Sequence, residues 1–402
     1  MQNKMTEGNV IRALAAFTVP LILSGLFQQL FNWVDAFIVG NVEGETALAG
    51  IGATTSVYNL FVTVITGFAS GLSVLTAQRY GMGEKGKIRE LLSSYTVLFA
   101  LLFTVISAAG AVFTEELLVV LDTPETIFFS AQSYLKILFA GIPFIAVYNT
   151  YSAVLRGIGN SSVPFFSILV CSAVNVVLDL LFVAGMGYGA AGAAAATAIS
   201  QAAMAVYVIV YTVRKYPFLR FSFSGNLPDK TVWKSGAAYG LPSAVQSGVS
   251  SAGNIYLQQF MNGFGEHTVA AITTAYRVDT VIFLPIINFG SGIATVVAQN
   301  IGAGKPERAK QVFHAISRFY MIYGISMAVR GCLEGRGDML FSGIAGILSL
   351  GVRILCSYAF KPVFGNMVVA YAEAFSWIFL LAVLLLRYVV KTRQTFPHFV
   401  KK

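Results

Sequence analysis

Residues 164–179 read PFFSILVCSAVNVVLD, so an apolar run here contains the carboxylate of Asp179. Asn175 lies four positions before it, which places both polar side chains on one face of a helix. The run is long enough to cross a bilayer, where a carboxylate costs roughly 2.5–3.5 kcal/mol on insertion scales. A functional role is therefore the first hypothesis for Asp179, and the rest of the chain is interpreted around this helix.

The composition excludes most soluble classes of protein. Of 402 residues, 56% are hydrophobic and only 11% are charged, whereas a soluble domain carries about 25% charged residues. Apolar runs longer than about 18 residues recur, which predicts an all-α polytopic membrane protein. The net charge of +9 does not indicate nucleic-acid binding, because the basic residues fall in short loops between apolar runs. The three cysteines have no CxxC spacing, which argues against zinc or a disulfide framework.

The apolar runs predict eleven membrane spans in two groups. The candidate spans are about 14–40, 52–78, 91–113, 127–155, 162–184, 190–213, 235–263, 268–298, 309–330, 338–360 and 366–390. Six precede the stretch 214–234, which is basic and contains Pro217 and Pro228. We therefore expect a bundle over 1–213, a cytoplasmic linker over 214–234 and a second bundle over 235–402. The first span is too long for a signal peptide and is expected to be retained.

The loop charges predict the orientation. Residues 13–78 contain no Lys or Arg, and the basic residues that follow, Arg156 among them, gather in alternate loops. The opposite loops carry acidic residues instead, such as Glu115 and Glu116. Because basic loops face the cytoplasm, the N-terminus is expected on the cytoplasmic side of the plasma (inner) membrane.

The chain contains an internal repeat. The segment from Gly67 to Gly83 parallels Asn288 to Gly304 at an offset of 221 positions, with Gln78 matched by Gln299. The glycines of 157–160 resemble those of 335–338 at an offset of only 178. Two related halves that enter from the same side form a parallel repeat, an arrangement of many secondary transporters.

The second half is thus 43 residues shorter, and the shortfall lies between Arg308 and Arg330. The first half uses the matching region for two spans, whereas Ala309–Val329 can supply only one. A single span there would place the basic C-terminal tail outside, against the positive-inside rule. Either this segment fails to span, or the last two spans are oriented against their charges.

Two carboxylates and two polar neighbours form the predicted cation site. Asp35 lies deep in the first span, and Asp179 lies at a similar depth, about two turns from an outer boundary. Carboxylates that meet in a low dielectric can take up a proton, or can hold Na⁺ together with Asn175 and a hydroxyl oxygen of Thr197. Structural alternatives remain: Asp35 could cap a helix end, Asn175 could join two helices, and Thr197 could bond its own backbone.

The second half differs at the equivalent positions, since Asn175 corresponds to Arg353 and Asp179 to Ser357. Arg277 and Asp279 fit a local ion pair or substrate contacts, and Glu373 fits a cavity or a capping role. The polar residues expected to line a substrate cavity are Gln28, Asn32, Tyr148, Arg277, Asp279 and Glu373.

No catalytic motif supports an enzyme. The segment 81–86 formally matches GxGxxG, but it follows a helix rather than a strand, so nucleotide binding is not expected. No Walker motif, HExxH motif or plausible Ser-His-Asp set accompanies the three histidines. We therefore expect no catalytic residues and no cofactor other than a coupling ion, H⁺ or Na⁺.

Several motifs together resemble the bacterial multidrug and toxic compound extrusion (MATE) family. They are FNWVD ending at Asp35, AQ at 77–78 with GMG at 81–83, LRGIGN at 155–160, NVVLD at 175–179, and GAAG at 189–192 followed by Thr197. The resemblance covers nearly the whole chain and implies a V-shaped cavity between two bundles. It also associates the acids matching Asp35 and Asp179, with Asn175 and Thr197, with cation coupling. The shortened second half departs from the family's twelve spans.

The resemblance implies a secondary antiporter that exports organic cations and other drugs in exchange for H⁺ or Na⁺ by alternating access. Its expected partners are amphipathic or cationic small molecules and the lipid bilayer, with no nucleic acid, and the chain is expected to be a monomer. A flippase for lipid-linked precursors, from the same superfamily, is one alternative. An inactive transporter that has lost a pair of spans is another.

Overall fold

The computed structural model describes residues 5–121, 123–221, 230–264, 266–316 and 322–395. The described residues form helices and no strand, which confirms the predicted all-α architecture. The helices are α1 (Val10–Gly81), α2 (Lys85–Val112), α3 (Thr114–Val120), α4 (Glu125–Gly157), α5 (Ser162–Asp179), α6 (Gly189–Lys215), α7 (Lys230–Asn262), α8 (Glu266–Gly302), α9 (Pro306–Ile316), α10 (Ile322–Gly335), α11 (Met339–Phe364) and α12 (Val368–Thr395). Short π and 3₁₀ segments cover Leu180–Gly185, Pro217–Leu219 and Gly365–Met367.

The element α1 doubles back on itself. Asn300 of α8 donates a hydrogen bond of 3.1 Å to the carbonyl of Met5, just before α1 begins. Near the other end of α1, the carbonyl of Gln78 lies against Gly302 of the same helix α8. A straight helix of 72 residues would hold its ends roughly 100 Å apart. The element therefore contains the first two predicted spans, one running out and one running back.

Nine helical segments are long and apolar enough to cross a membrane within the described residues. They are Val10–Val42, Val57–Gly81, Lys85–Val112, Glu125–Gly157, Ser162–Gly185, Gly189–Lys215, Phe283–Gly302, Met339–Phe364 and Val368–Lys391. The first six match the six spans predicted for the first half. The helix α7 is long enough at 33 residues, but its Ser, Gln and Asn side chains make it more polar than the others.

The segment expected as a span over 309–330 is instead two short helices, α9 and α10. They contain 11 and 14 residues, or about 16 and 21 Å, against about 30 Å for the hydrocarbon core. Residues 317–321 between them lie outside the described part of the chain. Each helix alone is therefore too short to cross.

The packing of α10 shows where this pair of helices begins and ends. The helix α9 starts directly after α8, and α10 then runs parallel to α8, because Gly331 packs on the carbonyl of Gly290 and Gly335 on that of Ala294. At its end, Gly335 accepts a 2.9 Å hydrogen bond from Gln78. Both ends of the pair thus lie at one end of the molecule, which supports the first sequence alternative: this segment does not span.

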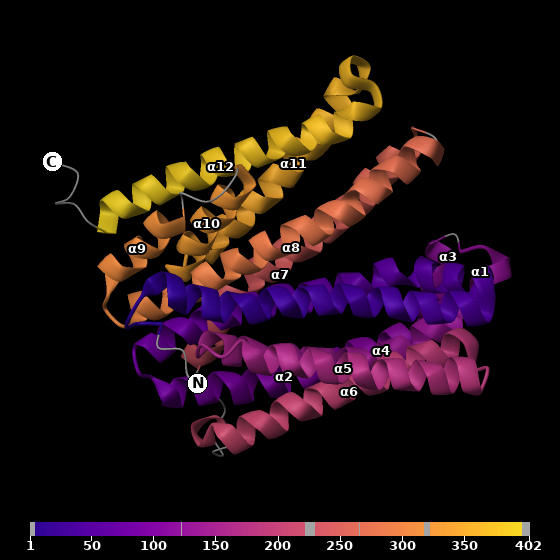
Figure 1. Ribbon diagram of the computed structural model, residues 1–402, viewed down its shortest axis with the longest axis horizontal. Coiled ribbons are helices and arrows are strands. Elements are labelled where there is room, and N and C mark those ends of the chain that lie inside the picture. The colour runs from indigo at the N-terminus through magenta and orange to yellow at the C-terminus, as the bar shows by residue number, and fades with distance from the viewer. Residues whose placement is uncertain (1–4, 122, 222–229, 265, 317–321, 396–402) are drawn as a thin grey trace.

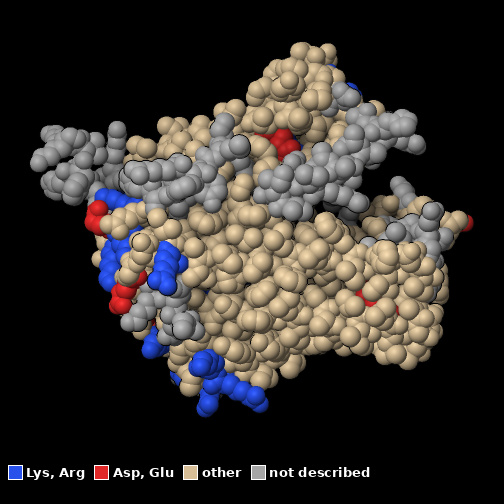
Figure 2. Space-filling model, in the orientation of Figure 1, with Lys and Arg blue, Asp and Glu red and all other residues tan. Residues whose placement is uncertain are grey.

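The position of the tail follows from this. The helix α11 runs outward beside α7, and α12 returns, where Arg387 donates to Asp338 at 2.8 Å. The start of α1 and the end of α12 therefore lie at one end of the molecule (Figure 1). Lys and Arg side chains gather there as well (Figure 2). We call it the basic end, and it contains Arg79, Lys305, Arg336 and Arg387.

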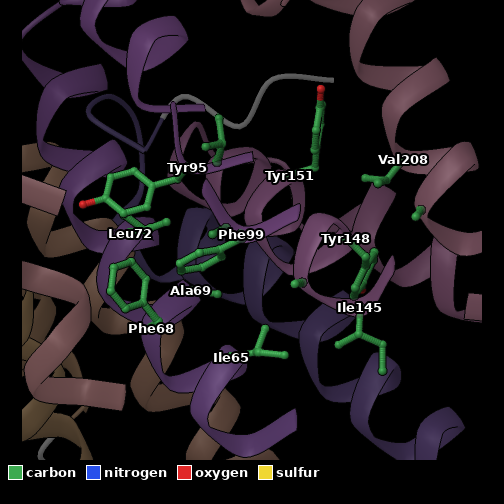
Figure 3. Packing of buried hydrophobic residues seen from close by; sticks show 14 of the residues in the cluster. Ile65, Phe68, Ala69, Leu72, Tyr95, Phe99, Ile145, Tyr148, Tyr151 and Val208 are labelled. Carbon is green, nitrogen blue, oxygen red and sulfur yellow. The ribbon is translucent and has the colours of Figure 1, made fainter. Parts of the chain in front are cut away.

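Apolar packing joins the two halves near the basic end. Phe68, Tyr95 and Phe99 form an aromatic cluster with ring centroids 4.8–5.8 Å apart (Figure 3). The hydroxyl of Tyr95 donates to the carbonyl of Trp233 in α7 at 2.8 Å. On the other side, Phe17 at the start of α1 is buried in the core of the second half.

Two equivalent hydrogen bonds also close the basic end. Gln78 of the first half donates to Gly335 of the second half at 2.9 Å, and Gln299 of the second half donates to Gly157 of the first half at 2.7 Å. Both glutamines, and both glycines, are partners in the sequence repeat. The second-half helices α8, α11 and α12 diverge from the first half toward the opposite end (Figure 1).

Small residues allow this close approach. The stretch Gly67 to Gly71 has the GxxxG spacing typical of tightly packed membrane helices. A Cβ at Gly71 would lie 2.0 Å from the carbonyl oxygen of Tyr239 in α7. The helices therefore meet backbone to backbone, and the molecule is closed at the basic end and open at the other.

Candidate cation and substrate sites

A cavity of about 650 Å³ lies inside the first half, between α1, α4, α5 and α6. Asp35 and Thr197 are on its wall, together with Gln28 and Tyr134. Asp35 lies seven residues before the end of the first span at Val42. The cavity therefore belongs to the open end of the molecule rather than to the basic end.

Asp179 and Asn175 lie behind this wall and are completely buried, each with an exposed fraction of 0%. They share one face of α5, as their four-residue spacing predicts. The carboxyl groups of Asp35 and Asp179 are near neighbours, close enough to interact electrostatically. Segments that are 144 positions apart in the sequence are thus brought to one point.

The oxygen atoms at this point have few donors. Asn175 Nδ2 donates to Thr197 Oγ1 at 3.4 Å. Among the described residues, no hydrogen-bond donor reaches either carboxylate oxygen of Asp179, Oδ1 of Asp35 or Oδ1 of Asn175. Burying such acceptors without a partner is costly, and the cost is larger for a charged group.

This arrangement can bind a proton or a small hard cation. Two adjacent carboxylates repel each other, and a proton or a cation between them removes that repulsion. Carboxylate, amide and hydroxyl oxygens are ligands that hard cations prefer. A transition-metal centre does not fit, because the described residues contain no group of three or more His, Cys, Asp or Glu side chains.

The helix changes its winding directly after Asp179. The α-helical hydrogen bonds of α5 end there, and Leu180–Gly185 forms a π-helical turn. Short π segments are uncommon and occur frequently at functional sites. The wider turn sets the direction of the backbone just beyond the carboxylate, and nothing in the sequence indicated it.

The predicted substrate residues divide into three groups. Gln28 and Tyr148 line a second cavity of about 370 Å³, which lies deeper toward the basic end. Glu373 lines a third cavity, in the second half. The side chains of Asn32, Arg277 and Asp279 lie outside the described residues, although their helices α1 and α8 are described.

The second-half cavity has a volume of about 470 Å³. On its wall, Arg353 Nη2 lies 3.1 Å from a carboxylate oxygen of Glu373 and 2.7 Å from the hydroxyl of Tyr276. These residues come from α11, α12 and α8. The sequence repeat indicated that Arg353 occupies the position of Asn175, but not that Glu373 would pair with it.

The cavity between the two halves contains two charged residues that were not predicted from the sequence. Arg156 and Glu334 both line a cavity of about 380 Å³ between the halves, near the basic end. Arg156 had been placed among the loop charges, yet it lies in the last turn of α4. Glu334 is held by Arg330 at 2.7 Å. Arg156 and Glu334 are related by the 178-residue offset, and this reversal of charge was the available signal.

The comparisons with known proteins give the family. The sequence profile of the MatE family matches residues 20–181 and 242–318, more than half of the chain. The chain belongs to the MatE family. The resemblance found in the sequence is thereby confirmed, and this MatE protein is a multi-span membrane protein from a family of multidrug efflux transporters, with small molecules as the class of substrate.

Curated relatives agree with this assignment. The "Probable multidrug resistance protein YpnP" of Bacillus subtilis is 30% identical over 306 residues, which are 75% of this chain and 68% of the relative. YoeA of the same organism, also named a probable multidrug resistance protein, is 30% identical over 331 residues, 80% of this chain and 71% of the relative. A protein of Shewanella oneidensis named "FAD transporter" is 24% identical over 319 residues, 78% of this chain and 70% of the relative.

Solved structures confirm the fold. A crystal structure of MATE in the bent conformation superimposes with a TM-score of 0.90 at 20% identity and covers 97% of both chains. An outward-facing multidrug resistance MATE transporter superimposes with a TM-score of 0.86 at 20% identity, over 97% of both chains. At this level of identity the likeness concerns the architecture of this MatE protein alone.

Proposed function

We propose that this protein is a secondary active antiporter that exports organic cations and other drugs in exchange for H⁺ or Na⁺. The observation that carries the proposal is the pairing of Asp35, on the cavity wall, with Asp179, which is completely buried. An intramembrane carboxylate is costly and usually marks an ion pathway. Two of them, beside the unbonded oxygen of Asn175, give a site whose charge depends on the bound cation.

The proposed mechanism is alternating access. In the state described, the basic end is closed by Gln78 and Gln299, while the first-half cavity lies toward the open end. A cation that enters from outside neutralises Asp35 and Asp179 and favours helix packing that releases the substrate. Because the cation and the substrate favour different states, the cation gradient drives export.

The proposed orientation places the basic end in the cytoplasm and the protein in the plasma membrane. The support is the distribution of Lys and Arg, which is typical of cytoplasmic loops. We further propose that the chain works as a monomer, because α1, α7 and α8 of a single chain supply the contacts between the halves.

Two alternatives have less support. A flippase for lipid-linked precursors is not favoured by the two Bacillus subtilis relatives, whose names describe multidrug resistance. The inactive transporter that has lost a pair of spans is less favoured, because the acid pair and the hydrogen bonds that close the basic end are retained although α9 and α10 are too short to span.

The experiment that tests this proposal uses everted vesicles or proteoliposomes containing the full chain. Ethidium is added as a permanent organic cation, and an H⁺ gradient or a Na⁺ gradient is imposed separately. Uptake that follows one gradient, with release of the same ion when ethidium is added, supports antiport. Uptake that ignores both gradients contradicts it.

A further inference from the structure

The segment that precedes α1 is held by the second half through its backbone. The carbonyl groups of four consecutive residues, 5–8, accept hydrogen bonds from side chains at the end of α8 and the start of α9. These bonds are 2.7–3.3 Å long and run from Arg308 to Met5, Glu7 and Gly8, from Lys305 to Thr6, and from Asn300 to Met5. We call residues 5–8 the N-terminal strap.

Both ends of the N-terminal strap are fixed. At its start, the side chain of Met5 is only 1% exposed and lies in the same apolar cluster as Val312 of α9. At its other end, the side chain of Asn9 caps α1 and accepts from the backbone N–H groups of Ile11 and Arg12 at 2.9 and 3.1 Å. Such a cap satisfies N–H groups that have no partner within the helix. The strap therefore ties the start of α1 directly to α9.

Most of the N-terminal strap is bound without being buried. Met5 is the buried anchor, whereas Glu7 and Gly8 are exposed. If their carbonyl groups leave the side-chain donors, water can take the place of those donors, so release creates no buried unpaired acceptor. A contact of this kind can form and break reversibly.

The residues that hold the strap differ between the two halves. At the offset of 221, Arg308 corresponds to Lys87 and Lys305 corresponds to Glu84. In the first half, Lys87 and Glu84 bond each other at 2.7 Å. Because the second half has a lysine in place of the acid, this local pair is lost and both cations bind carbonyl groups of the strap. The short helix α9 thus keeps the residues that the strap requires.

The starts of α1 and α7 each pack in the opposite half. Phe17 of α1 lies in the apolar core of the second half, whereas Val39, farther along the same span, lies in a cluster of the first half. The carbonyl of Trp233 in α7 binds Tyr95 of the first half, whereas Phe260 of α7 packs in the second half. Halves that separate at the basic end as rigid bodies must therefore withdraw both helix starts, and the start of α1 is the one that the strap holds.

We propose that the N-terminal strap is a latch on the basic end, bound when that end is closed and released when it opens. Arg308 is its main receptor, because one guanidinium makes three of the five bonds. A guanidinium presents its N–H groups in a fixed fork and can hold several acceptors at once. The latch acts on the closure of the basic end, and its action does not depend on which ion or substrate is carried.

Distances between spin labels at Met82 and Leu340 test the latch. Both side chains are exposed, and they lie at the basic end in opposite halves. The labels are attached to a full chain whose three native cysteines are replaced by alanine. Arg308→Ala should raise the ratio of open to closed molecules roughly 10-fold, because charge-assisted hydrogen bonds at an exposed site are lost. Arg308→Lys keeps the charge without the fork, so its effect should be smaller.

Deletion of residues 2–8 removes the strap itself and retains Asn9 as the cap of α1. This deletion should open the basic end at least as much as Arg308→Ala does. Lys87→Ala is the matched control, because it removes the repeat partner of Arg308, and it should leave the distances unchanged. If the deletion and Arg308→Ala both give the wild-type distances, the proposal is wrong.

A spin label at Thr6 tests the release step directly. The label should be immobile in the wild-type protein. It should become mobile in the double variant Gln78→Leu with Gln299→Leu, in proportion to the molecules whose distance from Met82 to Leu340 lengthens. A label that stays immobile while this distance lengthens would show that the start of α1 remains with the second half, which contradicts the latch.

The latch and the export function can fail separately. The distances are measured without substrate and without an ion gradient, so they do not depend on transport. Failure of the wild-type protein to transport ethidium with either gradient would remove the export function. Normal ethidium transport combined with wild-type distances in Arg308→Ala and in the deletion would remove the latch only.

Discussion

The two halves of this protein share a repeat but differ in length and in the charge of their cavities. The first half keeps six spans and places Asp35, on its cavity wall, beside the buried Asp179. The second half keeps the basic-end parts of one helical hairpin, α9 and α10, and places Arg353 and Glu373 in its cavity. Both halves nevertheless contribute one glutamine and one glycine carbonyl to the closed basic end.

This difference shows which parts of a half can be lost while its contacts at the basic end remain. The 43 missing residues correspond to the outer portions of two helices and the loop that joins them. The contacts made by Gly331 and Gly335 with α8 survive, because they lie in the retained portion of α10. Closure of the basic end thus needs only the short helices, while the proposed cation site lies in the half that keeps its full length.

The largest effect expected is an all-or-none result on the position of the tail. A reporter that is active only in the cytoplasm should be active when it is fused after Lys402, because α9 and α10 return to the end of the molecule at which they begin. Reporters after Lys215 and at Glu116 in α3 serve as cytoplasmic and external references. An external position of Lys402 would contradict the even number of crossings and the placement of both halves' basic residues at one end of the molecule.

The second-largest effect, on transport, is expected from loss of one carboxylate of the acid pair. Asp179→Asn and Asp35→Asn keep the shape of the site and remove a charge, so coupled ethidium transport should fall by roughly 100-fold, the factor that corresponds to about 3 kcal/mol. Glu116→Gln in the exposed part of α3 is the control and should retain transport. Asp179→Asn protein with normal coupling would show that the first half does not carry the cation.

Filling the closest helix contact should hinder closure of the basic end. Gly71→Val places a side chain where a Cβ already lies 2.0 Å from the carbonyl of Tyr239. Overpacking of this kind costs about 1–3 kcal/mol, so transport should fall by roughly 5- to 100-fold. Gly86→Ala is the matched control, because its Cβ meets nothing within 4 Å. Equal activity of the two variants would show that this contact is not needed for transport.

Removing the two equivalent hydrogen bonds should have a smaller effect on the same closure. Gln299→Leu loses one hydrogen bond, worth about 0.5–1.5 kcal/mol. Gln78→Leu also loses the bond that Gln78 accepts from the hydroxyl of Tyr239 at 2.7 Å. Each variant should shift the conformational equilibrium by a few-fold or more, in the same direction. Spin labels at Met82 and Lys305 report the separation of the halves at the basic end. A shift from only one of the two variants would break the symmetry inferred from the repeat.

The smallest change expected is at the edge of the cation site. Asn175→Ala removes one neutral oxygen while both carboxylates remain, so the cation affinity should fall by about 3- to 10-fold. The concentration of Na⁺ or H⁺ that gives half-maximal exchange measures this shift. A loss as large as that of Asp179→Asn would mean that the amide, rather than the acid pair, dominates the site.

The fold, and the meeting of Asp35, Asn175 and Asp179 at one point, could be predicted from the sequence for identifiable reasons. Long apolar runs and a four-residue spacing are local signals, so the spans and the shared face of Asn175 and Asp179 could be predicted. The offset of the repeat also located the missing residues. The pairing of Arg353 with Glu373 depends on how α11 packs on α12, and no local pattern reports it.

Two features needed the structure itself. The sequence did not decide whether 309–330 crosses the membrane, because its apolar content fits one span. Only the contacts of α10 with α8 show that the chain returns to the end of the molecule where α9 begins. Arg156 was assigned to a loop because it follows a long apolar run, although the last turn of α4 carries it to the floor of the central space. A charged residue at a helix end can lie in a loop or in a cavity between two halves, and the sequence alone does not distinguish these positions.

The central claim is that the first half carries the exchanged cation and the second half does not. Release of H⁺ or Na⁺ from the purified protein when ethidium binds, measured in weakly buffered solution, tests it most directly. The wild-type protein and Arg353→Ala should release the ion to the same extent, while Asp35→Asn and Asp179→Asn should release none. Continued release from both acid variants, or its loss in Arg353→Ala alone, would contradict the account.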